Sequence, residues 1–371
     1  MLAPLEVMEV VPDPKQIVKE LDRYIIGQED AKKALALLVF ARGMTVLQDY
    51  GKISSKIKFK RENLMMIGPT GCGKSFLVKT LADIIDFPIS IIDSTQITGN
   101  GWHGRDIDEV LYDHMKSVAE FMKTKHLLLN EEELEELYYT KYSYGIIYFD
   151  EFDKNRIRRD EGHLSSQEST QSAFLKVLEG CEMEIGTGEY NQTVPGKYTK
   201  QKTHIDTSKL SFIVGGTFEG IEDITRKRLQ KKGGIGFTGI VDFSNHEGKS
   251  LLKHVNTDDL VEYGFMREIV GRFSLRAVLD PLTVNELSDI LVVPENNPVS
   301  RYKEVFKVFG IDLHLTREAI RQIAEIAKDM NTGARALENL LNKVLQPELF
   351  NIYHTLEEKL IITKNIVIDR C

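Results

Sequence analysis

Short apolar runs and longer amphipathic stretches alternate along most of the chain. The apolar runs at 63–67, 145–149 and 210–214 have the length and composition of buried strands. Between them, apolar residues recur every three or four positions, and one such helical stripe consists of Leu77, Leu81, Ile84 and Ile85. This alternation predicts an α/β fold, with a parallel sheet that is flanked by helices on both faces.

The pattern changes in the last quarter of the chain. Apolar residues there form mainly helical stripes, such as those within 320–327 and 337–345. We therefore divide the chain into a large α/β domain, 1–278, and a smaller, mainly helical C-terminal domain, 279–371. The turn around Pro281 is a reasonable hinge between them.

The closing segment carries a different signal. Two short apolar runs, 360–362 and 366–368, lie on either side of Lys364 and Asn365. Runs of this length that flank polar residues are typical of a hairpin, so we expect a short β-hairpin at the end of the chain.

Composition and charge exclude several classes of protein. The 371 residues carry 48 basic and 56 acidic side chains, so the formal net charge is −8 and a uniformly basic nucleic-acid surface is disfavoured. The three cysteines are scattered, which argues against a disulfide framework or a zinc site. The sequence shows neither an apolar stretch of about 18 residues nor a signal-peptide pattern. We expect a cytoplasmic protein without zinc and without a membrane partner.

The sharpest motif is a glycine-rich run between the first predicted strand and the first helical stripe. It reads Gly68-Pro69-Thr70-Gly71-Cys72-Gly73-Lys74-Ser75, a complete phosphate loop of the Walker A type. Backbone N–H groups of such a loop point at phosphate oxygens, and its lysine contacts the β- and γ-phosphates. The hydroxyl of Ser75 would take one Mg²⁺ position. The run predicts a nucleotide site with Mg²⁺.

A second motif supplies the acids that hydrolysis requires. The apolar run 145–149 ends in Asp150 and Glu151, which is a Walker B pattern. A buried strand would deliver Asp150 to the mouth of the sheet, where its carboxylate can hold Mg²⁺ through a water. Glu151 is then placed to orient the attacking water and accept its proton. Together with the phosphate loop, this pair makes ATP hydrolysis the expected reaction.

Further segments, in a fixed order along the chain, resemble motifs of one family. The segment that begins Tyr24-Ile25-Ile26-Gly27-Gln28 resembles the adenine-side box of AAA+ ATPases. Val270-Gly271-Arg272-Phe273 resembles an arginine-finger segment, and Thr332-Gly333-Ala334-Arg335 resembles the start of a sensor-2 helix. From about residue 12 to 350, the chain resembles AAA+ ATPases of the Clp/HslU group and is closest to the ClpX family.

The resemblance implies roles for single residues. Ile26 would lie against adenine, although plain core packing is an equal alternative. Arg272 would act in catalysis by reaching the γ-phosphate of a neighbouring subunit, and Arg335 would approach the same phosphates from the small domain. For both arginines a structural ion pair or a surface charge is the alternative. Thr217 is a candidate polar sensor. An arginine finger that acts in trans requires a closed ring, so the resemblance implies a homohexamer.

Two glycine-flanked motifs resemble loops that contact other proteins. Gly101-Trp102-His103-Gly104 occupies the place of the family's pore loop, where an aromatic side chain would grip a polypeptide through apolar contact. Ile235-Gly236-Phe237 resembles the loop by which the family docks on the ClpP peptidase. The alternatives are that Trp102 anchors the core and that Phe237 packs into its own domain.

The resemblance therefore implies an ATP-dependent unfoldase and translocase of protein substrates that delivers them to a ClpP-like peptidase. This chain departs from the family in several places, of which two bear most on substrate recognition. We expect it to lack the family's four-cysteine zinc domain, because its first residues lead almost directly into the ATPase segments, and residues 186–202 stand where the family has a basic entrance loop. A stand-alone remodelling chaperone without a peptidase is the first alternative, and a motor on nucleic acid is a weaker one.

Overall fold

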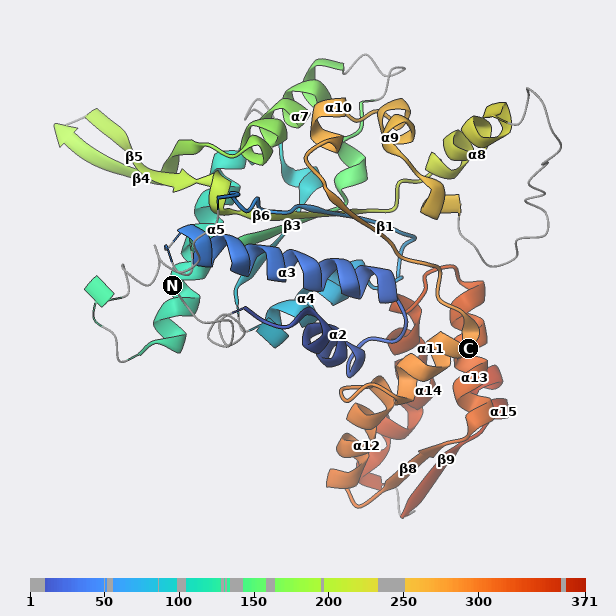
Figure 1. Cartoon of the computed structure of the whole chain (residues 1–371). Coiled ribbons are helices and arrows are strands. Elements are labelled where there is room, and N and C mark those ends of the chain that lie inside the picture. The colour runs from blue at the N-terminus through green and yellow to red at the C-terminus, as the bar shows by residue number, and fades with distance from the viewer. Residues whose placement is uncertain are drawn as a thin grey trace.

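A parallel β-sheet forms the centre of the large domain (Figure 1). The computed structural model describes residues 11–49, 51, 56–85, 87–98, 105–127, 130, 132–133, 143–157, 164–194, 197–232, 251–354 and 358–371. Within these ranges, five strands stand in the order β2-β3-β6-β1-β7, and each neighbouring pair is parallel. Their bounds are β1 Leu64–Ile67, β2 Ile89–Asp93, β3 Ile146–Asp150, β6 Ser211–Gly216 and β7 Leu275–Val278. The predicted parallel sheet is confirmed.

Helices cover both faces of this sheet because its strands are apolar on both sides. Along β1, Leu64 and Met66 face one core cluster, whereas Met65 and Ile67 face another. The first face carries α2 Pro14–Asp22, α3 Glu29–Asp49 and α4 Lys74–Ile85. The second face carries α5 Ile107–Lys125, α7 Leu164–Glu179, α8 Ile221–Lys232, α9 Thr257–Tyr263 and α10 Arg267–Val270.

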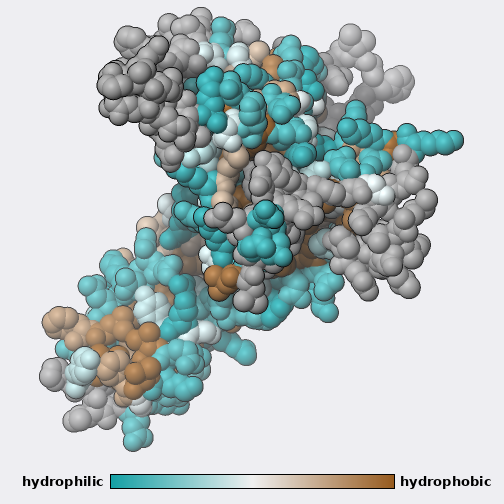
Figure 2. All heavy atoms as spheres, turned by 90° about the vertical axis from the view of Figure 1, so that its left-hand side faces the viewer, coloured by the Kyte–Doolittle hydropathy of each residue, from teal (hydrophilic) through white to brown (hydrophobic). Residues whose placement is uncertain are grey.

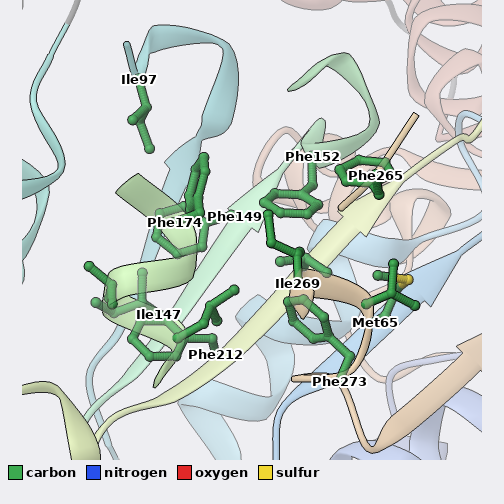
Figure 3. Packing of buried hydrophobic residues seen from close by; sticks show 14 of the residues in the cluster. Met65, Ile97, Ile147, Phe149, Phe152, Phe174, Phe212, Phe265, Ile269 and Phe273 are labelled. Carbon is green, nitrogen blue, oxygen red and sulfur yellow. The ribbon is translucent and has the colours of Figure 1, made fainter. Parts of the chain in front are cut away.

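Aromatic rings on the second face fix the segment that follows α10 (Figure 3). Phe152, in the 3-10 helix η3 Phe152–Asn155, stacks on Phe265 with 5.3 Å between ring centroids. It also meets Phe273 edge-on at 6.1 Å. Since Phe273 follows Arg272 directly, this packing holds the backbone from which the Arg272 side chain projects.

A long antiparallel hairpin extends from one side of the sheet (Figure 1). Its strands are β4 Glu182–Val194 and β5 Lys197–Asp206, so it occupies the region where the sequence departs from the family's entrance loop. Arg61 ties the base of the hairpin, donating to the carbonyl oxygens of Leu178 and Leu210 at 2.6 Å each. Burial lowers the pKa of its guanidinium to about 10, which leaves the group charged at neutral pH.

The C-terminal region is mainly helical and has a core of its own. Its elements are α11 Val284–Val292, α12 Pro298–Val308, β8 Asp312–Leu315, α13 Arg317–Asp329, α14 Arg335–Phe350, β9 Lys359–Ile362 and α15 Lys364–Arg370. The stripes predicted within 320–327 and 337–345 are buried in α13 and α14. β7 ends at Val278 and α11 begins at Val284, and we propose the domain boundary in this interval.

The prediction of a β-hairpin at the end of the chain is wrong. β9 pairs in parallel with β8, and residues 364–370 form the helix α15. The β-branched residues of α15 were misleading because packing decides their conformation here. Val367 is buried and Ile366 is partly buried against the core of the small domain.

The surface of the small domain carries exposed apolar side chains (Figure 2). At the ends of α12 and α14, the exposed apolar residues are Val305, Val308, Phe309, Phe350 and Tyr353. The rings of Phe309 and Tyr353 meet edge-on with centroids 5.1 Å apart. Among the described residues, no helix is both long and apolar enough to cross a membrane.

Candidate functional site

The phosphate loop connects β1 to α4, as its sequence predicts. Gly71 and Gly73 have φ angles of 74° and 101°, which side chains other than glycine rarely adopt. The loop curls over Lys74, whose ammonium donates to the carbonyl oxygens of Gly68 at 2.6 Å and Pro69 at 3.0 Å. Both acceptors are neutral, so the positive charge of Lys74 remains available to a phosphate group.

A pair of oxygen ligands suited to Mg²⁺ lies next to this loop. The hydroxyl of Ser75 donates to Oδ2 of Asp150, the last residue of β3. Hydroxyl and carboxylate oxygens are the ligands that Mg²⁺ prefers, and substrate phosphates complete its shell in such sites. The donor set therefore fits Mg²⁺. Among the described residues, no three histidine, cysteine or acidic side chains gather into a metal-binding group.

The Asp150 carboxylate is itself held in place. Its Oδ1 accepts from the Tyr148 hydroxyl at 3.0 Å and from the Glu151 backbone N–H at 2.9 Å. Burial, and then the charge of Asp150, raises the pKa of Tyr148, so the hydroxyl stays protonated and remains a donor. Glu151 has a left-handed φ of 54°, and its exposed side chain lines the pocket described next.

A pocket of about 390 Å³ lies over the phosphate loop. Its lining combines the phosphate loop, the Walker B acids, residues after β6 and the start of α14, and includes Lys74, Ser75, Asp150, Glu151, Asp153, Thr217 and Arg335. The structure thus brings Arg335 of the small domain to the pocket that holds the Walker residues. A polar pocket with two lysines, one arginine and several acids suits a phosphate chain with a cation.

Thr217 lies at the end of β6, as the sequence predicts for a polar sensor. Its backbone N–H and hydroxyl donate to the two carboxylate oxygens of Asp153, at 3.2 and 3.1 Å. Asp153 is only 2% exposed and was missed in the sequence. Its place two residues after Glu151 was the available signal, but only the fold shows that it meets Thr217.

A second, larger pocket of about 860 Å³ adjoins the first, because Phe76 and Ala334 line both. It lies between α2, α4 and the small domain, and its apolar lining includes Tyr24, Ile84, Ile290 and Leu337. An apolar pocket beside a phosphate site suits a nucleobase. Of the residues in the adenine-side box, Tyr24 lines this pocket. Ile26 is half-buried and does not line it. The role of Ile26 stays a prediction.

The two domains touch directly at the phosphate loop. The backbone N–H of Ala334 donates to the carbonyl oxygen of Gly71 at 3.1 Å. Gln28, which the sequence did not single out, makes a second link. Its side-chain amide donates to the carbonyl oxygens of Cys72 at 3.3 Å and Asp280 at 2.9 Å, and accepts from Asp280 N–H at 3.1 Å. The phosphate loop is therefore bonded to both the small domain and the hinge.

Arg272 lies away from the pocket of its own chain. Its half-exposed guanidinium forms an ion pair with Glu179, at the end of α7, at 2.8 Å. Its backbone carbonyl accepts from the buried side chain of Asn63 at 3.0 Å. An exposed arginine on an anchored backbone is able to reach a neighbouring molecule.

The predicted pore and docking loops, 101–104 and 235–237, lie outside the described residues. The residues that flank the first are described: Thr98 N–H donates to Arg105 O at 3.1 Å, and Arg105 N–H donates to Gln96 O at 2.8 Å. The described residues on either side of 99–104, Thr98 and Arg105, therefore lie next to each other.

Known proteins match both parts of the chain. A family model described as AAA domain (Cdc48 subfamily) matches residues 60–276, and one described as C-terminal, D2-small domain, of ClpB protein matches 282–361. The ATP-dependent Clp protease ATP-binding subunit ClpX of Borrelia duttonii is 33% identical over 368 residues, 97% of this chain and 79% of that protein. The ClpX subunit of Treponema denticola is 32% identical over 375 residues, 98% of this chain and 83% of that protein. The chain therefore belongs to the ClpX family of AAA+ ATPases, and its reaction is the hydrolysis of ATP.

Proposed function

We propose that this protein is an ATP-driven unfoldase and translocase of protein substrates that works as a homohexameric ring and delivers polypeptide to a ClpP-like peptidase. One observation carries the proposal: Arg335 of the small domain lines the same pocket as Lys74, Asp150 and Glu151. A phosphate chain in this pocket would contact both domains, so its hydrolysis would change the angle between them.

The residues of the pocket have separate chemical roles. Lys74 and the loop N–H groups bind the phosphates, while Ser75 and Asp150 hold Mg²⁺, which neutralises phosphate charge when bound. Glu151 orients a water and takes its proton, and Arg335 stabilises charge on the phosphates from the small domain. Arg272, which is exposed beside Glu179 and outside the pocket of its own chain, supplies a guanidinium to the pocket of the neighbouring subunit.

The first test compares ATP turnover of the full chain with and without an unfolded polypeptide. Turnover is expected to rise with polypeptide, and Glu151→Gln is expected to lower it on the order of a hundred-fold or more while ATP still binds. Glu219→Gln changes another acid at the rim of the pocket and serves as the control, with turnover retained. Turnover that ignores polypeptide would contradict the translocase and favour a specialised remodeller or a nucleic-acid motor.

The proposed ring is tested by mixing two inactive variants. Lys74→Ala lacks a working pocket but keeps Arg272, and Arg272→Ala lacks the finger but keeps the pocket. Each alone is expected to be inactive, whereas mixed rings regain turnover where an intact pocket faces an intact finger. A mixture that shows only the sum of its separate components would mean that Arg272 acts within its own subunit or only in structure.

The proposed docking loop is tested by Ile235→Ala with Phe237→Ala. These changes are expected to abolish binding of a ClpP-like peptidase and leave polypeptide-stimulated ATP turnover unchanged. Unchanged peptidase binding would contradict the docking role and favour the chaperone that works without a peptidase.

A further inference from the structure

Tyr148 is a large polar side chain in the interior of the large domain, on the strand between β2 and β6. It lies in β3, two residues before Asp150, and is fully buried. Side chains two positions apart on a strand point to the same face, so the tyrosine ring runs beside the base of the Asp150 side chain. Its hydroxyl donates to Asp150 Oδ1 at 3.0 Å.

The neighbouring strand leaves room for this hydroxyl. Tyr148 is paired with Ile213 of β6, and Gly215 follows two residues later on the same face. A Cβ at Gly215 would overlap the tyrosine hydroxyl and lie 2.9 Å from two of its ring carbons. The glycine therefore provides space that the hydroxyl fills, and a phenylalanine at 148 would leave Asp150 with one donor fewer.

The hydroxyl determines which oxygen of Asp150 faces the metal position. Oδ1 already accepts from two donors, the Tyr148 hydroxyl and the Glu151 N–H. Oδ2 is consequently the oxygen that lies beside Ser75. With both donors in place, the carboxylate plane is fixed before any cation arrives, which removes an ordering cost from metal binding.

We propose that Tyr148 is a positioning residue of the magnesium site, which acts by holding Asp150 so that Oδ2 is presented next to Ser75. The inference rests on the proposed function, because it takes Ser75 and Asp150 as the residues that hold the metal. Removal of this one buried hydroxyl is expected to weaken cation binding while the pocket, the nucleotide contacts of the loop and the fold remain.

The test is a titration of Mn²⁺ into the full chain with a non-hydrolysable ATP analogue, with free Mn²⁺ read by electron paramagnetic resonance. Tyr148→Phe is expected to raise the Mn²⁺ midpoint roughly ten-fold, the effect typical of a lost partner of a metal ligand. Binding of the analogue in the presence of a chelator is expected to be unchanged. A midpoint equal to that of the unaltered protein would overturn the proposal.

Tyr144→Phe is a closely matched control. Tyr144 is also buried, at 2% exposure, and its hydroxyl donates to a carboxylate oxygen of Asp49 at 2.9 Å, away from the phosphate loop. This variant loses the same chemical group and the same type of hydrogen bond. It is expected to keep the Mn²⁺ midpoint, and an equal shift in both variants would assign the effect to general loss of structure.

Two further variants complete the design. Gly215→Ala keeps the hydroxyl but fills its space, so it is expected to raise the midpoint as well, and it keeps the test decisive if Tyr148→Phe does not fold. Asp150→Asn is expected to shift the midpoint further than Tyr148→Phe. If Asp150→Asn leaves the midpoint unchanged, the metal assignment of the proposed function fails, whereas a shift confined to Asp150→Asn refutes only the positioning role of Tyr148.

Discussion

His114 lies on α5 with its imidazole fully buried between the start of β3 and the neighbouring strand β2. Its Nδ1 is 2.7 Å from the hydroxyl of Ser90, and Gly145 lies against the other side of the ring, where a Cβ would overlap Nε2. Burial lowers the pKa of His114 to about 4. A single histidine thus stays neutral in the folded protein at a pH where it is protonated in the unfolded chain.

This residue makes stability depend on pH. The unfolded histidine has a pKa of about 6.5, so between pH 6.5 and 4 the unfolded state binds a proton that the folded state does not. The contribution to stability is complete above pH 6.5 and falls by about 3 kcal/mol as the pH drops to 4. Urea unfolding at pH 7 and pH 4.5 is expected to show a smaller loss for His114→Gln than for the unaltered protein. His314→Gln, at an exposed position on β8, is the control and should retain the full loss.

At the scale of elements, α8 and α9 are joined by one carboxylate. Asp259 is 1% exposed and accepts from the Arg228 guanidinium at 2.7 and 2.8 Å, from the Thr225 hydroxyl at 3.1 Å and from Asn256 N–H at 3.0 Å. Burial by itself would raise the pKa of Asp259, but these donors outweigh it and lower the pKa. The charged form is therefore part of the folded state.

We expect Asp259→Asn to lower the free energy of unfolding by about 3 kcal/mol, because it leaves Arg228 with no carboxylate in a mostly buried position. The neighbouring ion pair between Asp258 and Arg267 is well exposed, so Asp258→Asn is expected to cost under about 1 kcal/mol. Chemical denaturation of both variants at neutral pH measures the difference. The difference should shrink as the pH falls through the lowered pKa of Asp259, where the carboxylate is protonated in both folded and unfolded states. Equal effects of the two changes would contradict this account.

Elements with a local signal could be predicted from the sequence, and others could not. β1, β3 and β6 are short, mostly apolar runs, and the stripes of α13 and α14 are regular, so their patterns sufficed. α15 was misread because its β-branched residues favour strand, and only the packing against the small-domain core makes them helical. Local pattern identifies an element when burial is uniform along a strand or follows a regular helical stripe.

The site also combines residues that have a local signal with residues that have none. The phosphate loop and the Walker B acids are contiguous in sequence, and their chemistry follows from their spacing. Gln28 bonds Asp280 across 252 positions, and Asn63 bonds Arg272 across 209. Contacts between such distant residues depend on the tertiary fold, so no sequence motif could predict them.

At the scale of the whole molecule, the phosphate loop is the place where the two domains are joined. Ala334 bonds the loop from the small domain, and Gln28 bonds both the loop and the hinge at Asp280. Gln28 is held in a left-handed conformation, with a φ of 59°, which costs free energy for a residue with a side chain. The position of the small domain is thus linked by hydrogen bonds to the groups that bind phosphate.

Gln28→Ala is expected to reduce the change in interdomain distance that nucleotide causes, because the loop and the hinge would no longer share a hydrogen-bonded amide. The distance between one dye on each domain, measured by fluorescence transfer with and without ADP, reports this change. Gln48 makes a similar pair of bonds within the large domain, to Ile57 O at 2.8 Å and from Phe59 N–H at 2.6 Å, so Gln48→Ala is the control. If Gln28→Ala shows the same nucleotide-induced change in interdomain distance as the unaltered protein, the coupling between the domains does not depend on this residue.

The ionic cluster of Arg228 and Asp259 joins the two ends of a longer segment. α8 ends at Lys232 and the next described residue is Leu251, so Arg228 and Asp259 hold together the two points between which residues 233–250 are inserted. The bonds described for these two side chains are all made to residues outside 233–250. Substitutions, insertions and deletions within 233–250 are therefore expected to leave these bonds intact, and natural selection can alter the proposed docking sequence there without rebuilding the ATPase that carries it.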